Sequence, residues 1–215
     1  MKVVVDSLGL FVEAFATTLS LTLLAAVGAL ILGTLIAAMR VSPVPPLQWV
    51  GRSYVRMVRN TPLPVVFFMV VFGLPEVDIV LSFYVFAVIA LMLYTASFVA
   101  EAVRSGINAV PVGQAEAARS IGLTFPQTLR IVLLPQALRT VIPPLASIFI
   151  ALLKNSSIAS AFGVAEAISL MQVLANDHAS AVLAILFATA AGYVILALGF
   201  GAVFSWLERR LVVSR

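Results

Sequence analysis

Lys154 is the side chain whose position in the sequence is most able to do chemistry. It interrupts a long apolar stretch, and Asn155, Ser156 and Ser157 come directly after it. If that stretch forms a membrane helix beginning near Val141, Lys154 lies ~20 Å along it at ~1.5 Å per residue, beyond the middle of a ~30 Å hydrocarbon core. A charge at that depth is costly and is by default a candidate functional residue. We therefore expect these four polar side chains to meet an anionic group such as a carboxylate.

Two other interpretations of Lys154 stay open. The long side chain could extend to the lipid headgroups on the outer side, or it could pair with an acidic residue such as Glu166. Neither of these would give it contact with a ligand.

Other kinds of chemistry find no support in the residue types. The chain has no cysteine and a single histidine, and it shows no metal-ligand spacing, paired carboxylates or Ser-His-Asp set. Its two lysines, Lys2 and Lys154, come after Met1 and Leu153, whereas a phosphate-binding P-loop needs Gly-Lys before Ser or Thr. We expect a chain that is not an enzyme, binds no metal or cofactor, and cannot itself bind ATP in that way.

The composition is that of an all-α integral membrane protein. Of 215 residues, 62% are hydrophobic and 10% are charged, against roughly 45–50% and about 25% in a soluble domain. A spanning helix needs about 20 apolar residues, and the uncharged runs predict five helices within one domain, residues 1–215. These helices cover about 15–39, 60–75, 81–100, 141–165 and 181–206. The first is expected to be retained because no cleavable signal pattern precedes it. Pro62 and Pro64 interrupt the second, either as a kink or as a gate-lining segment.

The basic residues predict the orientation. Eleven of the 13 Lys and Arg lie between the first and second helices, between the third and fourth, or after the fifth. The alternate loops carry acidic residues, among them Glu166. By the positive-inside rule the amino terminus is outside and the carboxyl terminus is cytoplasmic. The net charge of +4 is thus a signal of topology, and no nucleic-acid binding is expected.

The polar segment 113–135 stands out between two apolar spans. Gly113 precedes a run of good helix formers, and Gly122 is placed for a left-handed helix stop. Thr124 can then cap a second short helix, which Pro135 is expected to end. This helical stub either fits a groove of another protein or lies on the lipid headgroups. Nearby, Glu101 and Arg104 are three residues apart and are expected to form a local ion pair.

Several segments of the chain resemble a known family. The stub and the residues after it match a pattern of Glu-Ala-Ala, three residues, Gly, nine residues, Ile, one residue, Leu-Pro. The matching positions are Glu116, Ala117, Ala118, Gly122, Val132, Leu134 and Pro135, with Val132 in place of Ile. This pattern is similar to that of the permease subunits of ABC importers, and segments 59–63, 94–118 and 152–160 resemble the polar amino-acid branch. The sequence of these segments is most similar to permeases of glutamate uptake.

The resemblance implies a type I ABC importer permease fold in a bacterial plasma (inner) membrane. The stub would be a coupling helix that docks on an ATPase through Gly113, Gln114, Glu116, Ala117, Ala118 and Gly122. Candidates for the substrate path are Arg59, Asn60, Thr61, Lys154, Asn155, Ser156 and Ser157. The implied partners are two cytoplasmic ABC ATPases, which hold ATP and Mg, and a second permease that is identical or homologous. An extracytoplasmic amino-acid-binding protein is also implied, and the chain itself is embedded in the lipid bilayer.

Two rival functions stay open at this point. One is an ion-gradient-driven secondary amino-acid transporter or channel subunit, which would need acidic residues inside the membrane; the five predicted helices contain no internal Asp or Glu. The other is a membrane-anchored scaffold, in which Lys154 could become Leu without loss of function.

Overall fold

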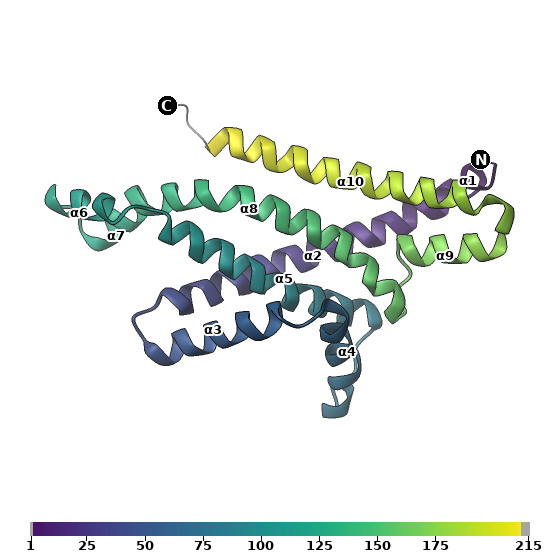
Figure 1. The fold of residues 1–215 in the computed structure, drawn as a ribbon, viewed down its shortest axis with the longest axis horizontal. Helices are drawn as coiled ribbons and strands as arrows, with labels where there is room; N and C mark the ends of the chain where they lie inside the picture. Colours follow the sequence, from purple (N-terminus) through teal and green to yellow (C-terminus); the bar gives the residue numbers. More distant parts are fainter. Residues whose placement is uncertain (1, 212–215) are drawn as a thin grey trace.

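Four long helices dominate the molecule. The computed structural model describes residues 2–211, and in it these are α2 (Leu8–Val41), α5 (Phe83–Asn108), α8 (Leu134–Asn155) and α10 (Val182–Leu211). All four are long and apolar enough to cross a membrane, α8 together with the turns before and after it. In Figure 1 they run along the long axis, with α1 (Lys2–Asp6) and α9 (Ala167–Asp177) toward one end. The other end carries α6 (Val112–Ser120) and the carboxyl end of α10.

These long helices extend past the expected limits. The prediction for 15–39 corresponds to α2 and that for 81–100 to α5, but α2 already includes Glu13 and α5 continues through Arg104. A charged residue does not stop a helix, because its side chain can reach water at the membrane surface while the backbone ladder continues. Uncharged runs therefore underestimate α2 at its amino end and α5 at its carboxyl end.

The helix expected over 60–75 is too short to span a membrane by itself. In its place lies α4 (Leu63–Gly73), 11 residues long, which corresponds to ~16 Å against a ~30 Å hydrocarbon core. It comes after α3 (Pro45–Arg59) at an angle of 107°, so the two form a fifth span only if the bent pair counts as one. Pro62 occupies the N-cap of α4 and Pro75 begins the turn after it, and proline lacks the N–H that would continue the ladder.

The prediction that Pro135 ends a helix is wrong. The chain is helical from α7 (Phe125–Gln127) through a π-helical segment (Thr128–Leu133) and directly into α8. Pro135 lies in the first turn of α8, where a missing N–H costs little, and the wider π turn before it accommodates the ring. The second part of the polar segment, residues 125–135, and the predicted fourth span are thus parts of one long helical rod, whereas α6 is a separate helix.

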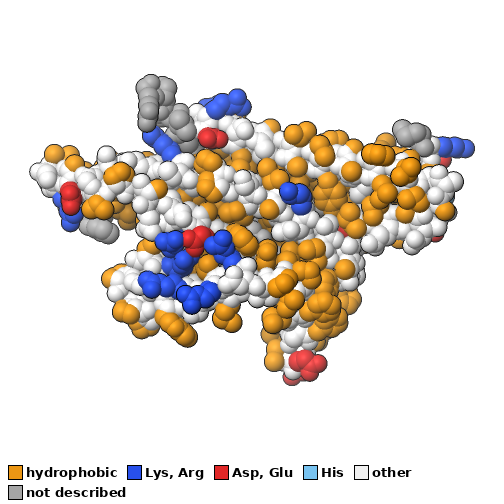
Figure 2. Space-filling view, in the orientation of Figure 1, with side chains coloured by type: hydrophobic (Ala, Val, Ile, Leu, Met, Phe, Trp, Pro, Cys, Tyr) orange, Lys and Arg blue, Asp and Glu red, His pale blue; other side chains and the backbone are white. Residues whose placement is uncertain are grey.

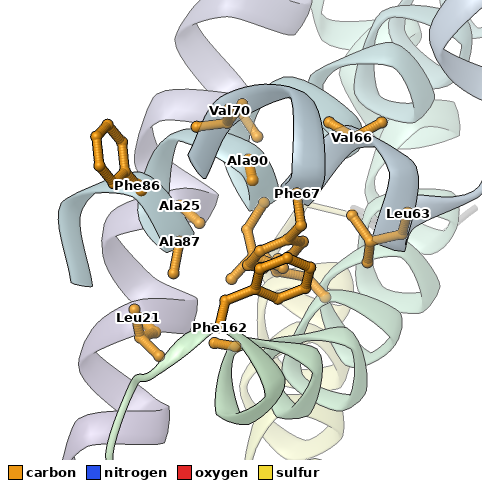
Figure 3. Packing of buried hydrophobic residues seen from close by; sticks show 14 of the residues in the cluster. Leu21, Ala25, Leu63, Val66, Phe67, Val70, Phe86, Ala87, Ala90 and Phe162 are labelled. Atoms are coloured by element: carbon orange, nitrogen blue, oxygen red, sulfur yellow. The ribbon is translucent and has the colours of Figure 1, made fainter. Parts of the chain in front are cut away.

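The core is built on close contact between α2 and α5. A Cβ added to Gly33 would lie 2.7 Å from Cβ of Val99 and 2.8 Å from the carbonyl oxygen of Ala96, so only glycine permits this approach. Figure 3 shows how α4 joins the same core: Phe67 points into it and meets Phe162, with ring centroids 4.9 Å apart. Phe162 ends a 3-10 turn (Ser156–Phe162) that comes after α8.

Helix α9 was not expected from the sequence. The predicted fourth helix, 141–165, ends instead at Asn155 and the 3-10 turn, and Gly163 then reverses the chain with φ +83°. Glu166, expected in an exposed loop, caps α9 and is fully buried. Counting uncharged residues does not distinguish a helix as short as α9 from a loop.

Candidate functional site

The stub helix α6 stops where expected, at Gly122, but it begins at Val112 and so already includes Gly113. Gly122 adopts φ +85°, and the N–H groups of Gly122 and Leu123 donate to the carbonyls of Arg119 (2.9 Å) and Ala118 (3.1 Å). These bonds satisfy the last carbonyls of the helix. A Cβ at Gly122 would meet nothing within 4 Å, so the requirement for glycine is conformational and not steric.

Almost all of α6 is exposed. Only Ala118 is buried, at 4% exposed, and it fixes the helix to the body of the molecule. Gly113, Gln114, Glu116 and Ala117 all lie on the open surface. The structure therefore brings five of the six predicted docking residues onto one protruding helix, with Gly122 closing it. Two large apolar side chains, Val112 (72% exposed) and Ile121 (78% exposed), flank it, and an exposed apolar pair beside a charged helix favours contact with a partner.

Side-chain hydrogen bonds of two glutamines lie where α6 meets the long rod. The side-chain oxygen of Gln127 accepts from both the N–H and the hydroxyl of Thr124, each at 2.9 Å. The roles are thus the reverse of the expected cap, because Gln127 supplies the accepting oxygen and Thr124 donates. Gln136 donates to the carbonyl of Val132 at 2.8 Å and lies 3.5 Å from the side-chain oxygen of Gln114. The Gln114–Gln136 contact is thus the side-chain hydrogen bond that joins α6 to the rod among the described residues.

The rod itself packs tightly on α5. A Cβ added to Gly106 would overlap a methyl group of Val141, and the Thr140 hydroxyl lies 3.3 Å from the Gly106 carbonyl oxygen. The carboxyl end of α5 and the start of α8 are therefore in close contact.

The predicted path residues after α8 fall into two groups. Asn155 is half-buried and lines a cavity of about 360 Å³ together with Tyr94, Thr95, Phe98 and Ser147, among others. This cavity lies between α5 and α8. Its lining is largely apolar, with polar groups from Tyr94, Thr95, Ser147 and Asn155 and no charged side chain.

Lys154 and the two serines differ in exposure. The Lys154 side chain is exposed, and the Ser157 hydroxyl donates to the Lys154 carbonyl at 2.7 Å. Ser156 is fully buried, and its hydroxyl donates to the Leu153 carbonyl at 2.7 Å. In this conformation Ser156 thus lies behind the surface that Asn155 presents.

The other predicted path residues lie at the junction of α3 and α4. The guanidinium of Arg59 lies over the Phe98 ring, 5.1 Å from its centroid, and 3.7 Å from the Glu101 carboxylate. Asn60 is the C-cap of α3, and the Thr61 hydroxyl donates to the Met57 carbonyl at 2.8 Å. Arg59 and Asn155 line different pockets, and Phe98 lines both of these pockets.

Glu101 gathers three arginines. It accepts from Arg104, which confirms the expected local pair, and from Arg40 at 2.7 Å across the gap between α5 and α2. Sequence spacing predicted the first pair only, because the partner on α2 is 61 residues away. The two helices are therefore clamped at the basic end of the bundle.

Glu166 is the functional candidate that the sequence analysis missed. One carboxylate oxygen accepts from the backbone N–H groups of Ile168 (2.8 Å) and Ser169 (3.1 Å). The other lies 2.9 Å from the Tyr193 hydroxyl and 3.2 Å from that of Thr18. Glu166 thus ties α9 to both α2 and α10. The suggested pairing of Lys154 with Glu166 is wrong, since Glu166 is fully buried among these other partners while Lys154 is exposed.

Comparisons with known proteins agree with this arrangement. The family described as binding-protein-dependent transport system inner membrane component matches residues 12–213. The chain is 42% identical to the glutamate transport system permease protein GluC of Corynebacterium glutamicum, with 94% of each covered. It is 37% identical to the probable glutamine ABC transporter permease protein GlnM of Bacillus subtilis, with 100% of this chain and 99% of that protein covered.

A solved structure shares the fold. The crystal structure of an amino acid ABC transporter with histidines contains a chain that is 34% identical to this one. The two superpose with a TM-score of 0.87, and the match covers 96% of each.

Proposed function

This chain belongs to the inner membrane components of binding-protein-dependent transport systems and is the permease subunit of an amino-acid ABC importer; from this premise we propose that it forms half of a translocation path for glutamate or a related acidic amino acid. The single observation that carries the acidic preference is the 42% identity to a glutamate permease over nearly the whole of both chains. The 37% identity to a glutamine permease shows why the cargo needs a direct test.

The proposed orientation has the amino terminus outside and the carboxyl terminus in the cytoplasm. Most of the Lys and Arg side chains visible in Figure 2 lie toward the end of the molecule that carries α6. Since basic loops stay cytoplasmic, α6 then faces the compartment that supplies ATP.

In this proposal α6 docks in a cleft of a cytoplasmic ATPase. Two ATPases, each contacted by one permease, bind ATP and Mg and close together. Their closure moves both α6 helices. The side-chain contacts of Gln127 and Gln136 pass the movement to α8, and the close contact at Gly106 passes it on to α5. The bundle opens outward to receive an amino acid from an extracytoplasmic binding protein, and hydrolysis returns it inward.

The cargo is proposed to pass along α8 and the α3–α4 junction. Lys154 and Asn155 supply a charge and an amide to the carboxylate that every amino acid carries, with Ser157 beside them. Ser156 supports this surface from behind. Phe98 lines both the cavity that contains Asn155 and the pocket that contains Arg59 and Asn60, and it therefore separates the two. Thr61 closes the turn between α3 and α4.

The ion-driven rival required a buried acid, and Glu166 is one. Its two oxygens, however, already face four donors on α2, α9 and α10. A carboxylate held in this way is suited to fastening helices, and the family membership assigns the energy source to ATP.

The test is uptake in the bacterium that carries the chain, before and after deletion of its gene. Labelled glutamate uptake should fall, and unlabelled glutamate and aspartate should compete with the native uptake far better than glutamine or cystine. Loss of glutamine uptake with intact glutamate uptake would refute the acidic preference while leaving the importer assignment standing.

A further inference from the structure

A large basic pocket lies between α2, α3 and α5. It has a volume of about 900 Å³. Its basic lining consists of Arg40, Arg52, Arg56, Arg59 and Arg104. Figure 2 shows these elements carrying a compact group of Lys and Arg side chains around a single acidic one.

The positive charge of this pocket is not balanced from within. In the described part of the chain every ion pair converges on Glu101, whose one carboxylate serves Arg40, Arg59 and Arg104. Arg52 donates to the neutral side chain of Gln48 at 2.6 Å. Neither Arg52 nor Arg56 has a carboxylate within 4.0 Å among residues 2–211. Five guanidinium groups facing one carboxylate predict that an anion completes the pocket.

The same helix presents an apolar strip beside the unpaired arginines. At ~100° per residue, Trp49 and Met57 lie next around α3 from Arg52 and Arg56. Both are 70% exposed, and Val50 between them is 47% exposed. A helix with a basic face next to an exposed apolar face that includes tryptophan is typical of one lying at the boundary between headgroups and acyl chains. The pocket thus opens where lipid headgroups are found.

We propose that Arg52 and Arg56 bind the phosphate group of an anionic phospholipid, with the lipid chains against Trp49 and Met57. The forked donors of arginine match phosphate oxygens, and basic pockets between membrane helices at the cytoplasmic side are suited to acidic headgroups. Arg40, Arg59 and Arg104 remain tied to Glu101 and are not needed for the lipid. The lipid assignment rests on the proposed cytoplasmic orientation of this end of the molecule and not on which amino acid is carried.

Trp49 allows this site to be measured locally. The full-length chain carries two tryptophans, so a Trp206→Phe background leaves Trp49 as the sole reporter. The protein is reconstituted in phosphatidylcholine with increasing amounts of phosphatidylglycerol brominated on its acyl chains. Quenching of Trp49, compared with brominated phosphatidylcholine, gives the preference for the anionic lipid.

We expect Arg52→Gln with Arg56→Gln to reduce that preference more than tenfold, since each basic side chain near an anionic surface contributes about fivefold. The matched pair Arg209→Gln with Arg210→Gln removes the same charge from α10 and should change it less than twofold. Arg52→Lys with Arg56→Lys should keep most of it, which separates charge from folding. Equal preference in all variants would overturn the proposal.

Soluble anions distinguish the other sources of the same charge. Inorganic phosphate or glutamate, added at constant ionic strength, should leave the preference for phosphatidylglycerol unchanged. Displacement by phosphate would make the pocket a site for a soluble phosphate group, and displacement by glutamate would extend the proposed cargo path from Arg59 and Asn60 to Arg52 and Arg56. Either result would overturn the assignment to lipid.

Discussion

Replacing Glu166 with Ala should destabilise the protein more than any other single change to a carboxylate. The side chain is fully buried and accepts from donors on three elements, at 2.8–3.2 Å. Hydrogen bonds to a charged acceptor contribute about 1.5–3 kcal/mol each but do not add, and losing an N-cap costs about 1 kcal/mol. Removing one partner of a buried charged network costs about 3–5 kcal/mol in total. At 2–4 °C per kcal/mol for a chain of this size, the midpoint of thermal unfolding should fall by roughly 6–20 °C.

The assay is thermal unfolding of the purified chain in detergent, monitored by loss of the monodisperse peak in size-exclusion chromatography. Glu208→Ala, on the exposed part of α10, is the matched control and should shift the midpoint by less than about 1 °C. Glu166→Gln keeps the shape and one acceptor and should lie between them, as should Tyr193→Phe. A Glu166→Ala protein that unfolds at the native temperature would refute the view that this carboxylate fastens α9 to α2 and α10.

Three further changes test the docking helix, the cargo path and the core. Gly122→Asp should leave membrane insertion intact but weaken co-purification of an ATPase, because aspartate adds a charge at the docking surface. Gly122→Asn has a similar cost in the left-handed conformation without the charge and should retain more of the ATPase; equal binding by both would count against the coupling role. Lys154→Leu should lower glutamate uptake at least tenfold at equal membrane levels, since a charged hydrogen bond contributes about 1.5–3 kcal/mol; full uptake would return the residue to a structural role. Gly33→Ala should cost about 1–3 kcal/mol of stability because its Cβ would lie 2.7 Å from Val99. The control Gly201→Ala, whose Cβ would have nothing within 4 Å, should be neutral. Similar unfolding midpoints for the two variants would show that α2 and α5 can separate freely.

The long helices and the stub could be predicted because local rules decide them. Apolar length predicted α2, α5 and α10, and the left-handed preference of glycine predicted the stop at Gly122, where φ is +85°. The Glu101–Arg104 pair likewise depends on residues three positions apart. Such features are decided by short stretches of the chain itself.

The features that could not be predicted depend on partners far away in the sequence, or on a neighbouring turn that accommodates an unfavourable residue. Glu166 looked like a loop residue, because its neutralising donors on α2 and α10 lie 148 and 27 residues away. Pro135 looked like a helix end, because nothing in the sequence indicates the π turn that accommodates it. The short α4 looked like a span, because apolar composition does not reveal that the 107° bend at Pro62 places α3 and α4 in different directions.

The most direct test of the central claim, that α6 couples this permease to a separate ATPase, is a pull-down through a carboxyl-terminal tag from detergent-solubilised membranes. The native chain should recover a protein with a P-loop and a second permease, both identified by mass. Glu116→Lys, on the exposed face of α6, should lose the ATPase, while Glu208→Lys, the same charge change on α10, should retain it. Recovery of the ATPase with Glu116→Lys at the native level, or of no ATPase with the native chain, would contradict the account.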